Sequence, residues 1–196
     1  MKNKIVWVCR ILVGLLFIFS GLIKMNDPLG FSYKLEEYFD VFHIGFLSNL
    51  ALSLAIILCT LEMVLGFALL IGVRAITVAR GLLILIIFFA FLTFYSAYFK
   101  VVQTCGCFGD AIPLTPWQSF SKDMVLLLLV LVIFINKKGI QPVFNKSRGD
   151  YMLMGSIVVA LCFGFYTYSF MPVIDFLPYK VGANIPHERV IPPGAV

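Results

Sequence analysis

The sequence has few charged residues. Asp, Glu, Lys and Arg make up 13% of its 196 residues, about half the share of a soluble domain. Histidine occurs only twice, in different segments. A pair of cysteine thiolates needs two further ligands to hold zinc, so the scarcity of histidine argues against a zinc site. Hydrophobic residues reach 61%, and the mean hydropathy is +1.01. We therefore expect an integral membrane protein of the all-α class, because lipid satisfies no backbone polar groups.

Apolar stretches long enough to cross a bilayer occur five times. A hydrocarbon core of about 30 Å takes roughly 20 helical residues. The candidate spans are residues 5–23, 47–73, 81–99, 116–135 and 151–171. We predict a four-helix membrane bundle over residues 1–136, a cytoplasmic loop over 137–150, a fifth span over 151–171 and an extracytoplasmic, proline-rich tail or linker over 172–196.

The positive charges are distributed unevenly along this topology. With a cytoplasmic N-terminus, the inner segments hold eight Lys and Arg residues and one nearby acid, Asp150, whereas the outer segments hold six basic and eight acidic residues. This asymmetry follows the positive-inside rule, so we expect a multi-pass membrane protein with a cytoplasmic N-terminus and an extracytoplasmic C-terminus. The net charge of +5 is explained by this topology, and we infer no nucleic-acid binding from it.

Two helix starts can be read from local motifs. Asp27 followed by Pro28 is typical of an N-cap and first helical position, and predicts an interfacial amphipathic helix between the first two spans. Its apolar face would hold Phe31, Leu35, Tyr38, Phe39 and Phe42. Thr115 and Gln118 form a capping-box pattern at the start of the fourth span. Because that span needs its first two turns to cross the bilayer, four of its residues should lie near the outer interface: Trp117, Phe120, Lys122 and Asp123.

The first two spans each carry a stripe of small and polar residues at helical spacing, and we expect these stripes to face protein. The first stripe is Arg10, Gly14, Phe17, Gly21 and Lys24; the second is Ser48, Ala51, Ala55, Cys59, Glu62, Gly66 and Leu69. A lone carboxylate at mid-membrane costs at least about 2.5 kcal/mol, so Glu62 should be protonated or paired. We predict Arg10 as its partner, either in a structural ion pair or in proton handling.

The outward-facing loop before the fourth span contains Cys105-Gly106-Cys107. A disulfide across one residue closes a small ring with unfavourable geometry, so it should exchange readily, and Gly106 leaves room for an attacking thiolate. Asp110 lies near the pair in sequence. Lys122 and Asp123 are expected to lie near the loop in space, and Lys122 should favour the thiolate through its charge. Trp117 and Phe120 offer a surface for a quinone headgroup. The alternative is a passive clamp on the loop, and we interpret Cys9, Cys59 and Cys162 as small buried hydrophobes.

Three motifs carry a resemblance to a known family: Phe19-Ser20-Gly21-Leu22-Ile23-Lys24, Glu62-x-x-x-Gly66 and Cys105-Gly106-Cys107-Phe108-Gly109. With them the chain resembles the bacterial DoxX/MauE-like membrane proteins over its first four spans. The resemblance implies a four-helix bundle in the bacterial inner (cytoplasmic) membrane that is associated with thiol redox work. The methylamine-utilisation branch of the family is tied to maturation of a disulfide-rich periplasmic dehydrogenase, but the resemblance does not imply that specific client for this chain. Members from Bacteroidetes can add a fifth span and a soluble outer domain.

Two functions remain open from the sequence. The first is a membrane thiol:disulfide redox protein, a candidate oxidoreductase linked to quinone, with Cys105 and Cys107 as reactive groups. Its partners would be extracytoplasmic thiol or disulfide proteins, or an attached outer domain. The second is a non-enzymatic assembly or anchoring subunit in which the cysteines brace a loop. A solute transporter has little support, since the chain shows no inverted repeat.

Overall fold

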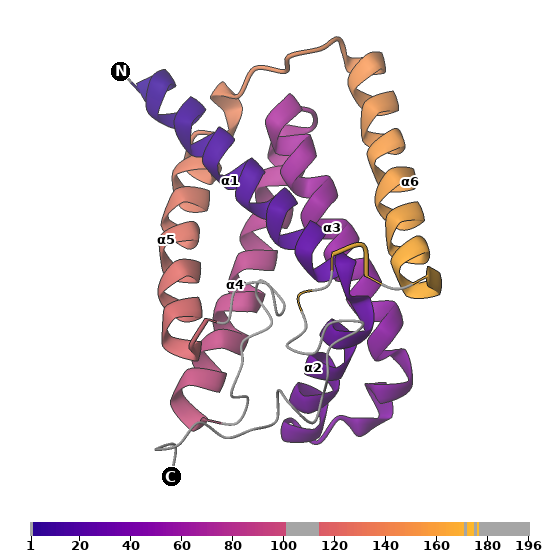
Figure 1. Cartoon of the computed structure of the whole chain (residues 1–196). Coiled ribbons are helices and arrows are strands. Elements are labelled where there is room, and N and C mark those ends of the chain that lie inside the picture. The colour runs from indigo at the N-terminus through magenta and orange to yellow at the C-terminus, as the bar shows by residue number, and fades with distance from the viewer. Residues whose placement is uncertain (1, 101–113, 171, 175, 177–196) are drawn as a thin grey trace, which may run out of the picture.

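The computed structural model describes residues 2–100, 114–170, 172–174 and 176, and within these it is built of helices and their connections (Figure 1). The α-helices are α1 (Lys2–Asn26), α2 (Pro28–Val41), α3 (Ala51–Ile71), α4 (Ala75–Phe99), α5 (Pro116–Ile135) and α6 (Lys146–Phe170). Short 3-10 turns cover Gly45–Leu50 and Lys137–Gly139. Five helical segments are long and apolar enough to cross a membrane, which confirms the prediction of an all-α, multi-pass membrane protein.

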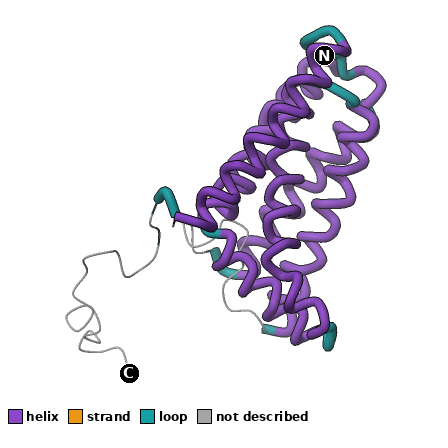
Figure 2. Tube along the Cα trace, turned by 90° about the vertical axis from the view of Figure 1, so that its right-hand side faces the viewer, coloured by secondary structure: helices purple, strands orange, loops and turns teal. Residues whose placement is uncertain are grey.

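Four of the spans form a closed bundle. Helix α1 packs against α3, α3 against α4, α4 against α5, and α5 closes the ring by contacting α1. Helix α6 lies outside this ring, against α3 and α1 (Figure 1). Seen from the side, the long helices run roughly along one direction (Figure 2). The predicted four-helix bundle with a fifth flanking span is therefore confirmed.

Glycines bring α1 and α3 into close contact. A Cβ atom at Gly14 would lie 2.6 Å from the Leu70 side chain, and one at Gly66 would lie 2.7 Å from the carbonyl oxygen of Gly14. A Cβ at Gly21 would lie 3.0 Å from the carbonyl oxygen of Cys59. At Gly66 and Gly21 a side chain would meet the backbone of the other helix, so the two helices would have to separate to admit it. The two small-residue stripes thus face each other as predicted, as small residues do between membrane helices.

Helix α2 is an amphipathic helix whose apolar face packs onto the bundle. Its N-cap is the predicted one, with the Asp27 carboxylate accepting a hydrogen bond from the Gly30 N–H at 2.9 Å. Phe31, Leu35 and Tyr38 are buried, and α2 contacts α3, α6 and α1. The stripe that could have entered lipid is therefore covered by protein.

Helix α6 begins at Lys146, five residues before the predicted start of the fifth span, so the end of the predicted 137–150 loop is helical. Its first turn is fixed by packing rather than by hydrophobicity. Gly149 is buried with its Cα against Val73, and Asp150 accepts a hydrogen bond from Arg74 at 3.0 Å. Polar residues at the end of a span lie at interface depth, where a helix can continue without an apolar sequence.

The far end of α6 is joined to the end of α1. The Thr167 hydroxyl donates a hydrogen bond to the carbonyl oxygen of Met25 at 2.7 Å. The Asn26 side chain then pairs with the backbone of Ile174, donating to its oxygen at 2.8 Å and accepting from its N–H at 3.1 Å. Ile174, four residues after the end of α6, is thus held beside the junction of α1 and α2.

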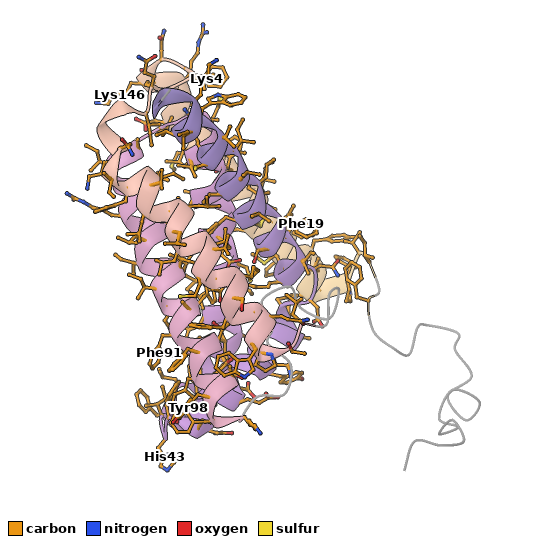
Figure 3. All side chains as sticks on the ribbon, turned by 90° about the vertical axis from the view of Figure 1, so that its left-hand side faces the viewer. Lys4, Phe19, His43, Phe91, Tyr98 and Lys146 are labelled. Carbon is orange, nitrogen blue, oxygen red and sulfur yellow. The ribbon has the colours of Figure 1, made fainter. Side chains whose placement is uncertain are left out.

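The two ends of the bundle differ in charge. Lys4 and Lys146 lie at one end, and His43 and Tyr98 lie at the other (Figure 3). Arg74 and Lys137 share the first end, because they adjoin the α3–α4 turn and the α5–α6 connection there (Figure 1). Large apolar side chains such as Ile84, Leu128 and Phe165 are 64–71% exposed along the outer faces, as expected for surfaces in contact with lipid. The cytoplasmic location of the basic end stays a prediction.

Replacing Gly66 with Ala should separate α1 from α3, because the new methyl group would contact the Gly14 backbone rather than a movable side chain. We expect a loss of about 1–3 kcal/mol, as for other overpacked interiors. Thermal unfolding in one detergent measures it. The matched control is Gly155→Ala in α6, where no atom lies within 4 Å of the added Cβ. That change should be neutral or stabilising by up to about 1 kcal/mol; equal losses in both variants would contradict the close-packing argument.

Candidate functional site

The cysteines of the predicted reactive pair, Cys105 and Cys107, lie outside the described residues, as do Gly106 and Asp110. The helix ends on either side are described. Helix α4 ends at Phe99, α5 begins at Pro116, and these two helices pack against each other. Both ends of the cysteine-containing segment are therefore attached to neighbouring helices at the same end of the bundle (Figure 1). The candidate site is built from the side chains beneath those helix ends.

The start of α5 has the predicted capping box. The Thr115 hydroxyl accepts from the Gln118 N–H at 3.4 Å, and the Gln118 side chain accepts from the Thr115 N–H at 3.0 Å. Trp117 is 55% exposed, and its ring centroid lies 6.2 Å from that of Phe120 at an interplanar angle of 80°. The planes of the two rings are thus nearly perpendicular, so Trp117 and Phe120 do not form the one flat surface expected for a planar ligand.

A buried ion pair joins α1 to α3. The Lys24 ammonium lies 2.5 Å from Glu62 Oε1, and the two side chains are 2% and 3% exposed. The same ammonium lies over the ring of Phe89, 4.1 Å from its centroid, and 5.3 Å from the centroid of Phe31. Aromatic faces and a carboxylate together compensate a cation removed from water. Glu62 is therefore paired with a cation, which is one of the two states predicted for it.

The predicted partner of Glu62 was wrong, because Arg10 binds elsewhere. Its guanidinium donates to the carbonyl oxygens of Leu69 at 2.7 Å, Leu70 at 2.6 Å and Gln141 at 3.1 Å. Leu69 and Leu70 are in the last turn of α3, where carbonyls lack helical partners and the helix dipole favours a cation. Arg10 therefore caps the end of α3 and joins it to the segment after α5.

The helix register explains this error. Gly14 lies against Gly66 and Leu70, and Gly21 lies against Cys59 and Met63, so α1 and α3 run antiparallel. Continuing that register puts Glu62 opposite residues 18–22 of α1. Arg10 is about ten residues away from there, or roughly 15 Å along the helix, whereas Lys24 is within one turn. Lys24 belongs to the first stripe together with Gly14 and Gly21, and this shared helix face was the signal for its pairing with Glu62.

A second ion pair lies at the start of α5. Asp123 is 1% exposed, and its Oδ1 atom lies 3.1 Å from the Lys122 ammonium. Its Oδ2 atom lies 3.0 Å from the hydroxyl of Thr93 in α4, which is also buried. Asp123 thus turns into the protein interior, whereas Lys122 keeps 23% of its side chain exposed. This satisfies the expectation that the two residues snorkel or turn inward.

The two ion pairs border one small cavity between α1, α3, α4 and α5. Its polar lining is Ser20, Lys24, Glu62, Lys122 and Asp123. The cavity has a volume of about 20 Å³, which is enough for about one water molecule. Glu62 Oε2 is buried, and none of the described residues donates a hydrogen bond to it. A water in this cavity would satisfy that atom and would bring a hydrogen-bonded path close to both carboxylates.

The polar chamber, as we call this cavity and its five polar residues, lies just below the helix ends that carry the cysteine segment. From Pro116 to Asp123 the distance along α5 is about 10 Å, and from Thr93 to Phe99 along α4 it is about 9 Å. Lys24 lies in the last turn of α1, which leads to the same end, and Figure 3 shows Phe19, next to Ser20, near mid-height between Lys4 and Tyr98. The chamber is therefore in the half of the bundle that faces the predicted thiol pair.

The other cysteines divide into two groups. Cys9 and Cys59 are buried, in agreement with their interpretation as small apolar residues, whereas Cys162 is exposed on α6, against that interpretation. Within the described ranges, no group of three or more His, Cys, Asp or Glu side chains is arranged to hold a metal ion.

A closed bundle of membrane-spanning helices with two buried ion pairs defines a multi-pass membrane protein with a polar interior. The sequence model of the family described as methylamine utilisation protein MauE matches residues 2–136, which are the four-helix bundle, and the chain belongs to this family. A relative, Protein TlpB of Flavobacterium psychrophilum, is 30% identical over 154 residues. That match covers 76% of this chain and 40% of the relative, so the chain spans well under half of it. No solved structure matches the chain.

Breaking the Lys24–Glu62 pair from one side should destabilise the protein more than removing both charges. Glu62→Gln or Lys24→Met alone leaves one buried charge uncompensated, and we expect each to cost about 3–5 kcal/mol. The double variant should recover most of that loss. Thermal unfolding of the four proteins gives the coupling energy. The control is the more exposed pair Lys34–Glu37 in α2, whose charged atoms are 3.3 Å apart. Its coupling energy should be about 1 kcal/mol or less. Additive losses at Lys24 and Glu62 would contradict the pairing.

Proposed function

We propose that this protein is a membrane-embedded thiol:disulfide redox protein that acts on extracytoplasmic thiols through Cys105 and Cys107. The observation that carries the proposal is the polar chamber beneath the helix ends that hold the cysteine segment. Buried charges are costly in a membrane and mark functional pathways there. Membership of the MauE family and the similarity to Protein TlpB support a redox-related membrane role.

The proposed reaction is disulfide exchange, which balances without a further cofactor. A thiolate of the client protein attacks one sulfur of the Cys105–Cys107 disulfide and forms a mixed disulfide, releasing the other cysteine as a thiolate. A second client thiolate then displaces the first cysteine. The client gains a disulfide, and two electrons and two protons are left on the cysteine pair. The reverse sequence reduces a client, and the relative potentials of the two pairs decide the direction.

Reoxidation within the membrane would require an acceptor, and a quinone of the bilayer is the class we propose. It would take the two electrons and two protons from the reduced pair and leave as a quinol. Exposed aromatic side chains flank the segment on both sides, Tyr98 and Phe99 at the end of α4 and Trp117 at the start of α5, and would contact the quinone ring. The chamber would conduct protons between the segment and the bilayer interior. In the alternative, an assembly or anchoring subunit, the same disulfide would be inert.

The exchange proposal is tested by a variant in which Cys9, Cys59 and Cys162 are replaced by Ser. The retained pair, Cys105 and Cys107, is titrated with mixtures of reduced and oxidised dithiothreitol, and its redox state is measured by maleimide labelling. We expect a reversible titration with a reduction potential more oxidising than about −300 mV. A further Cys107→Ser change should trap mixed disulfides with extracytoplasmic proteins. The matched control keeps Cys162 alone, which lies on the exposed face of α6. A pair that resists reduction at such potentials, or no trapped client, would favour the assembly role.

Lys122 provides a test of the link between chamber and thiols. We expect Lys122→Met to slow exchange with a model dithiol several-fold, because a nearby cation stabilises the attacking or leaving thiolate. Lys34→Met removes a cation from the outer face of α2 and serves as the control. The rates are measured by stopped-flow at several ionic strengths. Equal rates in both variants would remove Lys122 from the mechanism and leave the exchange reaction itself standing.

A further inference from the structure

A groove lies at the basic end of the bundle, far from the polar chamber. It is bordered by the turn between α3 and α4, by the segment that follows α5 and by the start of α6. Its volume is about 560 Å³, within the range of ligand sites. Nothing in the proposed redox reaction uses it.

The groove carries an excess of positive charge. Arg74, Lys137 and Lys146 line it, and the one acidic residue in its lining is Asp150, which pairs with Arg74 at 3.0 Å. Lys137 is held over the ring of Phe134, with 3.5 Å between its ammonium and the ring centroid. Three cations against one carboxylate leave a net charge of two, so the groove fits an anion.

The backbone adds to this preference. Ala75, Ile76 and Thr77, the first turn of α4, line the same groove. Helix α4 begins there without a side-chain cap. The first N–H groups of a helix lack helical partners, and the helix dipole places a partial positive charge at them. The start of α4 therefore reinforces the three side-chain cations and is not the basis of the site by itself.

The remaining lining is apolar, which distinguishes this groove from a site for a free anion. Ile76, Ile140 and Phe144 line it, and Ile76 and Phe144 keep 43% and 38% of their surface exposed. The groove is at the ends of the spans α4 and α6, which is the depth at which phosphates give way to acyl chains. Cations and apolar walls at that depth match a lipid that carries a negative headgroup.

We propose that this groove binds an anionic phospholipid, with its phosphate near Arg74 and Lys146 and its upper acyl chains against Ile76 and Phe144. Basic pockets between membrane helices recognise such headgroups. The bound lipid would bridge the α3–α4 turn and the start of α6, which are otherwise joined there by the Arg74–Asp150 pair and by the packing of Gly149 on Val73.

The test uses the full chain, stripped of lipid in a neutral detergent and titrated with dihexanoyl-phosphatidylglycerol or dihexanoyl-phosphatidylcholine. Binding is followed by the shift in melting temperature and by native mass spectrometry. We expect saturable binding of phosphatidylglycerol and none of phosphatidylcholine. In Lys137→Gln/Lys146→Gln the affinity for phosphatidylglycerol should fall by about 25-fold, or about fivefold for each cation removed.

The matched control is Lys4→Gln/Arg148→Gln, which removes two cations that are exposed and outside the groove lining. Lys4 lies at the same end of the bundle as Lys146 (Figure 3). The control should keep its affinity within about threefold. If the first double variant does not fold, Thr77→Glu places a negative charge in the groove at an exposed position and should weaken binding in the same direction.

Three results would overturn the proposal. Equal binding of phosphatidylcholine would show a general lipid contact, and an equal loss in the control variant would show attraction to surface charge alone. Displacement of the lipid by inorganic phosphate at matched concentration would show a site for a free anion.

Discussion

The structure depends on the pairing of Lys24 with Glu62 inside the bundle. A carboxylate and an ammonium withdrawn from water are each strongly destabilising, and in contact they offset one another only when held at short range. Glycines at 14, 21 and 66 make this possible by letting α1 and α3 approach closely. Phe31 from α2 and Phe89 from α4 complete the surroundings of the ammonium. Four helices are thus positioned around one pair of charges.

The second pair, Lys122 with Asp123, gives the same half of the bundle a polar interior. Alone, it would be a local feature of the first turns of α5. Because both pairs border one cavity, and because Thr93 of α4 also contacts Asp123, the polar chamber joins every helix of the closed ring. At the opposite end the three hydrogen bonds of Arg10 close the bundle through backbone carbonyls. Charge within the membrane is therefore arranged differently at the two ends: in side-chain pairs near the cysteine segment, and in a capped helix end near the basic surface.

Much of this architecture could be predicted from the sequence. Length and apolarity locate five spans, Asp27 and Thr115 locate two helix starts, and the glycine stripes identify the faces of α1 and α3. The wrong pairing of Arg10 with Glu62 came from judging depth by position in each span without the register between them. The start of α6 was also placed late, because contacts of Gly149 and Asp150 with the α3–α4 turn fix it, and no local pattern encodes those contacts. The burial of the amphipathic face of α2 likewise depends on tertiary packing, since an interfacial helix and a docked helix share one periodicity.

The hydrogen bonds between Asn26 and Ile174 have a consequence for anything that follows α6. They fix the departure point of the chain beside the α1–α2 junction, in the half of the molecule that contains both ion pairs. A module connected there would reach that surface as an intramolecular partner, and its effective concentration would be set by the number of intervening residues and their stiffness instead of by its abundance in the cell. Loss of this two-bond anchor would lengthen the tether by several residues and dilute such a partner without altering any of its own contacts.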